Sequence, residues 1–438
     1  MTSAVESARP IRETRMTQAR DLARTTPGIL MLLAVATVVA SVLVGALTAG
    51  GVAHRANTLD TLEHRSGPLA VAAQDVYRAL SDADATANSG FLAGGQESPA
   101  VRSRYTADIR QAGAALALAT SAQSSSTTAD PSSPVAVLTA NLPVYTGLVE
   151  TARADNLQGL PVGAAYQREA SHLMRGLLLP AAESLYRTQV AHLAADEDSA
   201  GGFPWTEAAV GLILIAVLAA AQWFVWRRSR RRLNAGLTLA TLAATLSLLW
   251  VLLASFLVMS SVHSARADGS SQTDVLTEAR IDALQARADE TLTLVARDGG
   301  AEYEKDYTAA YSNGKGMLDR ALSIATDPHV TREVRAARDA QTQWNGAHEA
   351  IRSSDDGGDY GAAVQRAIGT EPDGAASAFD KVDTSLSSAI AATSGAFERN
   401  VADAHDTLTG AVWGVIILAV LTAAAAVAGL WQRLKEYR

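Results

Sequence analysis

The chain of 438 residues contains no cysteine, and aromatic residues make up only 5% of it. The absence of cysteine excludes disulfide bonds, thiolate nucleophiles and metal sites with cysteine ligands. Prolines are also few, and the remaining composition is rich in Ala, Leu, Arg, Asp, Glu, Gln and Thr, which favours helix over strand. Any part of the chain that lies in water must therefore be stabilised by the packing of helices.

Lysine is scarce as well, so arginine carries nearly all of the positive charge of a chain whose net charge is −8. This net charge is the sum of two opposed terms, because basic residues concentrate beside apolar runs while acidic residues lie in the long polar segments between them. The long polar segments are net negative. This charge disfavours a role in binding nucleic acids.

Four long apolar runs divide the chain into two halves. They cover residues 28–52, 206–226, 235–262 and 410–431. Each run exceeds the roughly 20 residues that an α-helix needs to cross a bilayer core of about 30 Å, and none holds an ionisable side chain well inside it. The sequence therefore predicts four transmembrane helices in a multi-pass protein of the plasma membrane. The first run is too long for a signal peptide, and Gly51–Ala53 resembles a cleavage site only weakly.

Short arginine-rich segments indicate how the chain is oriented in the membrane. The N-terminal tail (1–27), the turn between the second and third runs (227–234) and the C-terminal tail (432–438) hold thirteen basic residues against four acidic ones. Short loops rich in Arg and Lys stay in the cytoplasm. We therefore expect both termini in the cytoplasm, and both long polar segments, residues 53–205 and 263–409, outside it.

Within each polar segment, apolar residues recur at the three- and four-residue spacing of an amphipathic helix, as in residues 69–92 and 275–295. Stretches rich in Gly, Ser, Thr or Asp separate four such helices in each segment, and they cover residues 94–95, 121–134, 159–163, 299–300, 326–329 and 355–361. The predicted fold class is an all-α membrane protein in which each polar segment forms an up-down-up-down four-helix bundle.

The two halves of the chain also resemble each other. Four residues recur at constant spacing: Tyr145, Gly147, Glu150 and Arg153 match Trp344, Gly346, Glu349 and Arg352. A second match pairs residues 163–168 with residues 361–366, and the two Gly-Gly turns align. Several matches in the same order predict an internal duplication. Since both copies are expected to begin and end in the cytoplasm, the repeat is parallel and not inverted.

The sequence shows no arrangement of residues that is typical of catalysis or cofactor binding. None of the eight histidines lies in a zinc-binding spacing, and the pair Glu169 and His172 lacks the further ligands of a di-iron site. No phosphate-binding glycine loop and no nucleophile elbow occurs. The cytoplasmic segments are too short to fold into an enzyme domain. We therefore expect a protein that is not an enzyme and that has no metal or cofactor.

Two sets of residues are candidates for binding. The first lies in the membrane-distal turns of the bundles, where an extracytoplasmic partner could dock: Gly94, Gly95, Gln96, Asn156, Gln158, Asp298, Gly299, Gly300, Asp355 and Asp356. The second is the arginine cluster of the cytoplasmic turn: Arg227, Arg228, Arg230, Arg231 and Arg232. These arginines could contact a cytoplasmic partner, but topology and attraction to anionic lipids explain them equally well. Arginines of the outer helices are expected mostly to pair with Asp or Glu.

In its span order, its two polar segments, its arginine-rich turn and its length, the chain resembles the four-span membrane component of an actinobacterial amino-acid (aspartate/glutamate) sensing operon. That component is encoded with a glutamine-binding-type lipoprotein and a soluble protein kinase G. The resemblance implies that the outer bundles receive the amino-acid-loaded lipoprotein, and that cytoplasmic segments pass its state to the serine/threonine kinase. The composition, rich in alanine and arginine, is typical of a high-GC actinobacterium.

From the residues alone, our hypothesis is a non-enzymatic signal transducer in the lipid bilayer, in which binding outside repositions one bundle relative to the other. A chemoreceptor-like sensor that binds a small molecule directly between its helices stays open, as does a structural or accessory protein of the cell envelope. A transporter is disfavoured, because buried charges normally mark a transport pathway. The identity of the ligand and the pairing of two chains as a homodimer also stay open.

Overall fold

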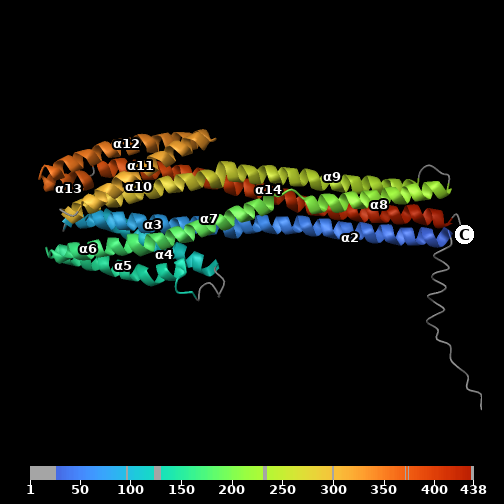
Figure 1. The fold of residues 1–438 in the computed structure, drawn as a ribbon, viewed down its shortest axis with the longest axis horizontal. Coiled ribbons are helices and arrows are strands. Elements are labelled where there is room, and N and C mark those ends of the chain that lie inside the picture. Colours follow the sequence, from blue (N-terminus) through green and yellow to red (C-terminus); the bar gives the residue numbers. More distant parts are fainter. Residues whose placement is uncertain are drawn as a thin grey trace, which may run out of the picture. The chain divides into compact units, whose positions relative to one another are not determined.

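The computed structural model describes residues 26–94, 97–122, 130–229, 234–297, 300–369, 371–372 and 374–435. These residues form helices joined by short connections, and no strand occurs among them (Figure 1). Four of the helices are long and apolar enough to cross a membrane. The prediction of an all-α protein with four long apolar helices is thus confirmed, and these helices indicate a multi-pass membrane protein.

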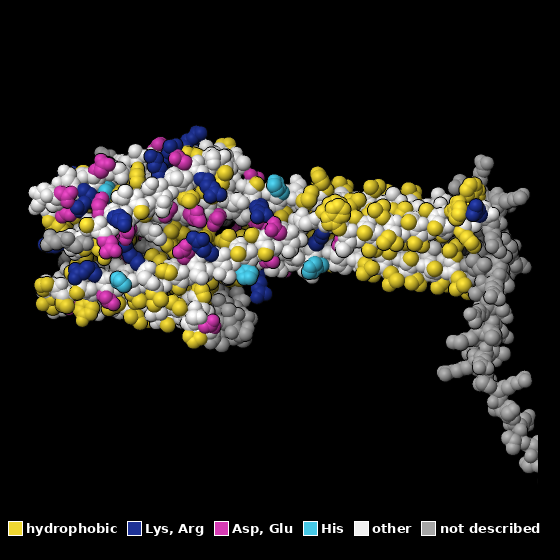
Figure 2. All heavy atoms as spheres, in the orientation of Figure 1, with side chains coloured by type: hydrophobic (Ala, Val, Ile, Leu, Met, Phe, Trp, Pro, Cys, Tyr) yellow, Lys and Arg dark blue, Asp and Glu magenta, His cyan; other side chains and the backbone are white. Residues whose placement is uncertain are grey.

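The apolar helices form one of two compact units, which comprises residues 1–58, 200–260 and 403–438. It contains most of α2 (Thr26–Thr61), α8 (Trp205–Ser229), most of α9 (Ala235–Ser264) and the end of α14 (Ala375–Lys435). Leu218, Leu237 and Ala426 belong to its core, whereas many other large apolar side chains are exposed on its surface (Figure 2). Such an apolar exterior suits contact with lipid.

Small residues allow close approach within this unit. A Cβ added to Gly236 of α9 would come within 2.1 Å of the Cα atom of Gly429 on α14. Asn234 fastens the same contact, because its Nδ2 atom donates a hydrogen bond of 3.0 Å to the carbonyl of Gly429. Glycines that let two helix backbones touch are typical of helix packing in membranes.

The second unit comprises residues 59–199 and 261–402 and contains two hydrophobic cores. The first core is built by α3 (Gly67–Leu92), α4 (Pro99–Ala122), α5 (Pro134–Leu157), α6 (Val162–Leu173) and α7 (Leu179–Gly201). The second core is built by α10 (Ser271–Ala296), α11 (Ala301–Ile324), α12 (Pro328–Asp356), α13 (Tyr360–Ile368) and the first part of α14. Helices α3 and α10 also pack against each other.

The turns of this unit follow local sequence signals. Ser133 and Asp327 cap α5 and α12 by accepting hydrogen bonds from backbone N–H groups of the first turn, and a proline occupies the first position of each helix. After α5 and after α12, Gly159 and Gly358 have φ angles of +69° and +82°. Glycine adopts this left-handed conformation without the steric cost that other residues meet.

Corresponding joints of the two halves contain π-helical segments. One (η1, Leu62–Ser66) connects α2 to α3, and another (η4, Ala265–Ser270) connects α9 to α10. A glycine at each of these joints lies against the same residue, because a Cβ atom added to Gly67 would come within 3.3 Å of the ring of Phe397, and one added to Gly269 within 2.6 Å of its Cβ atom. A third such segment (η3, Met174–Leu178) connects α6 to α7.

The expectation of four helices in each polar segment needs one correction. In the second half, the fourth helix is divided into α13 and α14 by an interruption between Ile368 and Ala375. Gly369, Pro372 and Gly374 lie in this stretch, and proline restricts the residue before it while glycine favours non-helical backbone. In the first half, α6, η3 and α7 follow one another without a gap.

Candidate functional site

The described residues of the predicted distal turns mainly hold those turns in shape. Asn156 donates a hydrogen bond of 2.8 Å from Nδ2 to the carbonyl of Phe91, which links the ends of α5 and α3. Gln158 is the C-cap of α5, and Gly300 is the N-cap of α11. Gly94 has a φ angle of +62°. Gly95, Gln96, Asp298 and Gly299 lie outside the described residues.

Asp355 and Asp356, at the end of α12, both accept hydrogen bonds from Arg352. The distances from its Nη1 and Nη2 atoms are 2.6 and 2.7 Å. Of the arginine cluster, Arg227 places its guanidinium 4.5 Å from the ring centre of Trp223. Arg228 belongs to α8, but its side chain lies outside the described part, as do the residues Arg230, Arg231 and Arg232.

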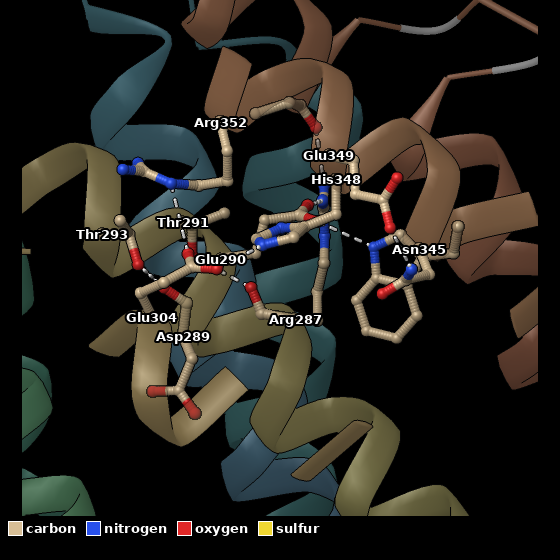
Figure 3. A network of polar contacts seen from close by, with 12 residues as sticks. Arg287, Asp289, Glu290, Thr291, Thr293, Glu304, Asn345, His348, Glu349 and Arg352 are labelled. Atoms are coloured by element: carbon tan, nitrogen blue, oxygen red, sulfur yellow. Dashed lines mark hydrogen bonds and ion pairs between the residues drawn. The ribbon is translucent and has the colours of Figure 1, made fainter. Parts of the chain in front are cut away.

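A charged core that sequence reasoning missed lies within the second half (Figure 3). It consists of Arg287 and Glu290 on α10, Glu304 on α11, and Trp344, His348 and Arg352 on α12.

Glu290 is at the centre of this charged core and is fully buried. Its carboxylate forms an ion pair with Arg287 and accepts a hydrogen bond of 2.8 Å from Nε1 of Trp344. The two ring nitrogens of His348 face two different carboxylates, Glu290 at 3.2 Å and Glu304 at 3.1 Å.

The contacts of the charged core determine its protonation. Burial lowers the pKa of His348, but the hydrogen bonds and charges of Glu290 and Glu304 outweigh burial and raise the pKa to about 9. Burial raises the pKa of Glu304, whereas His348 and Arg352 bring it below its ordinary value. At neutral pH the imidazolium of His348 therefore lies between two carboxylates. The ring of Tyr307 stacks on it at 3.6 Å.

The first half contains a polar core without cations among its hydrogen-bonding groups, which we call the neutral core. Asp84 of α3 is buried there and accepts hydrogen bonds from Tyr145 at 3.3 Å and Ser171 at 2.9 Å. Asn88 donates to the other oxygen of Asp84 at 3.3 Å and accepts from Gln167 at 2.7 Å. Burial raises the pKa of Asp84.

The repeat residues Tyr145 and Trp344 occupy equivalent places in these two cores. Each is fully buried, and each donates a hydrogen bond to a carboxylate on the first helix of its own half, Tyr145 from its hydroxyl and Trp344 from Nε1. Arg153 and Arg352, which belong to the same sequence repeat, also form matching contacts. Each pairs with a glutamate near the start of the second helix: Arg153 with Glu97 at 2.8 Å, and Arg352 with Glu304 at 3.3 Å.

Polar contacts also join the two halves within this unit. Arg175 of η3 forms an ion pair with Asp289 of α10, and Gln285 donates to the hydroxyl of Tyr77 at 2.6 Å. Arg104 of α4 reaches both Asp82 and Asp380, which lie on α3 and α14. Arg104 and Arg175 thus pair with carboxylates, as expected from the sequence for arginines of the outer helices.

Asp289 differs from its neighbour Glu290 in the direction it faces. Its carboxylate points away from Glu290 and His348 (Figure 3), and Asp289 lines an open cavity of about 390 Å³ bordered by α3, η3, α7, α10 and α11. Burial raises the pKa of Asp289 to about 7, although Arg175 acts in the opposite direction. Among the described residues, no group of three or more Asp, Glu or His side chains is arranged to hold a metal ion.

Residues 58–198 match the family model described as the actinobacterial sensor domain. The matched stretch covers the neutral core and the whole first half of the second unit. This match indicates a sensing role. No curated protein and no solved structure matches the chain.

Proposed function

We propose that the chain is a transmembrane sensor without catalytic activity of its own, whose helical halves receive a signal outside the cell. The observation that carries this proposal is the match of residues 58–198 to the actinobacterial sensor domain, in a chain with four helices long and apolar enough to cross a membrane. In the proposed topology, both termini and the arginine cluster are cytoplasmic, in line with the distribution of basic residues.

In this proposal the two halves are duplicated four-helix bundles. Three features support the duplication: the π-helical joints η1 and η4, the turn glycines with positive φ after α5 and α12, and the equivalent hydrogen bonds of Tyr145 and Trp344. If the second copy derives from the first, it is a sensor domain that has acquired a charged core.

The proposed input is an extracytoplasmic solute-binding lipoprotein, and the proposed output is a cytoplasmic serine/threonine kinase. Support comes from the resemblance to the amino-acid sensing operon. The end of α12 offers a physical route for the input, because Asp355 and Asp356 hold Arg352, which in turn contacts Glu304 of the charged core. A partner that binds these aspartates in one arrangement more tightly than in another would shift the equilibrium between them.

Affinity purification of the full chain from cross-linked actinobacterial membranes tests this proposal. We expect recovery of a solute-binding lipoprotein and of a serine/threonine kinase. The double variant Asp355→Asn, Asp356→Asn should recover less lipoprotein. Asp319→Asn is the matched control, because Asp319 also pairs with an arginine of α12, Arg338, at 3.0 Å. Recovery of envelope-assembly proteins with neither partner would contradict the relay and favour an accessory role.

A second candidate function is direct sensing of a small molecule. The cavity beside Arg175 and Asp289 favours it, because ligand sites in proteins are concave and contain a few convergent polar groups. Calorimetry of the purified full chain with free amino acids, in the presence and absence of the lipoprotein, separates the two candidates. Binding without the lipoprotein supports direct sensing, and binding only with it supports the relay.

A further inference from the structure

The cavity between the two halves has a polar lining. Nine of its lining side chains carry polar groups, among them Ser81, Asp84, Arg175, Glu183, Asp289 and Asp306. Five of these residues are charged, and three of the five (Asp84, Arg175 and Asp289) are also buried or half-buried. The helices that present them come from both halves, so the cavity requires both.

Three buried polar atoms of this lining lack a hydrogen-bond partner among the described residues: Oγ of Ser81, Nη2 of Arg175 and Oδ1 of Asp289, which forms an ion pair with Arg175. Within the part of the chain that the structure describes, neither Oγ of Ser81 nor Nη2 of Arg175 makes a hydrogen bond. Ser81 is only 2% exposed, so water outside the fold does not satisfy its hydroxyl. Buried polar atoms of folded proteins are almost always hydrogen-bonded. Because a hydroxyl and a guanidinium N–H border the same cavity, we expect a ligand that accepts hydrogen bonds from them.

The acidic groups of the lining indicate a second chemical group of the ligand. Four of the lining side chains are acidic and one is an arginine, so acidic groups outnumber basic groups in the cavity. Burial raises the pKa of Asp84 and brings that of Asp289 to about 7, which means that these carboxylates gain from a nearby cation. A metal ion does not suit the described lining, because no three acidic or histidine side chains in it converge on one point.

We propose that this cavity binds a small organic amine that also carries a hydroxyl or carbonyl oxygen. Its ammonium group faces Asp289 and the neighbouring carboxylates, and its oxygen accepts hydrogen bonds from Arg175 and Ser81. The volume of about 390 Å³ accommodates a molecule of several heavy atoms together with ordered water. Since α3 and α10 both line the site, the bound amine would hold the two halves in one arrangement.

Only the role of the bound amine in signalling rests on the direct-sensing function proposed above. Binding of the amine can be measured independently of that function. The experiment is isothermal titration of the full chain in nanodiscs with 4-amino-1-butanol. Two matched probes remove one feature each: 1,4-butanediol lacks the charge, and butylamine lacks the oxygen. We expect the amino alcohol to bind at least about tenfold more tightly than either probe.

Three variants locate the binding. Asp289→Asn should weaken binding of the amino alcohol about tenfold or more. Ser81→Ala should weaken binding several-fold and leave the unfolding temperature unchanged, because the hydroxyl has no partner among the described residues. Ala288→Leu keeps all carboxylates and fills the cavity, so it should abolish binding. The control Asp319→Asn, which removes a carboxylate outside the lining, should bind like the unaltered chain.

Two outcomes would overturn the assignment. The first is absence of binding, or equal binding of the amino alcohol and the diol. The second is unchanged affinity in both Ser81→Ala and Ala288→Leu, which would place the amine elsewhere. Neither outcome affects the relay through a lipoprotein, because that proposal is tested by co-purification. Conversely, loss of the lipoprotein partner would leave a measured amine site intact.

Discussion

The two halves of the second unit bury a carboxylate at an equivalent place but surround it differently. In the first half, Asp84 accepts hydrogen bonds from three neutral side chains. In the second half, Glu290 faces Arg287 and His348, and only Trp344 is a neutral donor. Removing a charge from water costs several kcal/mol, and this cost is offset either by neutral donors or by opposite charges.

This difference determines how strongly each core depends on its carboxylate. In the neutral core, burial has already raised the pKa of Asp84, so the protonated form is easily reached and an amide can replace it. In the charged core, the loss of one carboxylate leaves cations buried without a counter-charge. The second half should therefore lose much stability when its buried carboxylate is neutralised by substitution, whereas the first half should lose little.

The largest effect is expected from Glu290→Gln, which keeps the shape of the side chain but leaves Arg287 and His348 without their shared anion. An uncompensated buried charge costs about 3–5 kcal/mol. The matched variant Asp84→Asn should cost about 1 kcal/mol, because the amide oxygen still accepts hydrogen bonds. Denaturant unfolding of the full chain in detergent, followed by circular dichroism, measures both. Equal losses would show that the two cores do not differ.

The next effect is a dependence of stability on pH. The pKa of His348 is about 9 in the folded chain and 6.5 for an ordinary histidine. Its stabilisation is therefore complete below about pH 6.5 and is lost as the pH rises through about 9, for a total of about 3 kcal/mol. His348→Gln should unfold at a midpoint that changes little over this interval. A steep fall that persists in this variant would contradict the assignment.

A smaller loss of stability is expected at the arginine–glutamate ion pair that the two halves have in common. Arg153 and Arg352 each pair with a glutamate near the start of the second helix and are mostly buried. Replacing either by Gln should cost about 1–3 kcal/mol, and the two losses should be similar. The exposed pair Arg187 and Glu183 is the control, because Arg187→Gln should cost less than about 1 kcal/mol. Clearly unequal losses for Arg153 and Arg352 would weaken the equivalence of the two halves.

The helical class and the four apolar helices could be predicted from the sequence because hydropathy and the 3.6-residue period are local properties. The turns at Ser133, Gly159, Asp327 and Gly358 likewise depend on residues within a few positions. The interruption of the fourth helix in the second half was missed, although Gly369, Pro372 and Gly374 are a local signal for it.

The charged core could not be predicted, because α10 is buried on more than one side. It packs against α11 of its own half and against α3 of the other, so Arg287, Asp289 and Glu290 are all buried although they resemble a solvated stripe. Periodicity distinguishes a buried face from an exposed one only when a helix has both. The repeat of Tyr145 and Trp344 was visible in the sequence, but their carboxylate partners are 61 and 54 residues away.

The smallest effect tests whether the shared aromatic hydrogen bond contributes in the neutral core. Tyr145→Phe removes one of three donors to Asp84 and should cost about 1 kcal/mol, because Ser171 and Asn88 still satisfy the carboxylate. A double-mutant cycle with Asp84→Asn isolates the pair, and its coupling energy should be at most about 1 kcal/mol. In the charged core, the equivalent cycle of Trp344→Phe with Glu290→Gln should give a larger coupling, because Trp344 is the only neutral donor to Glu290 among the described side chains. Equal coupling energies would mean that the hydrogen bond from the aromatic residue contributes no more in the charged core than in the neutral core.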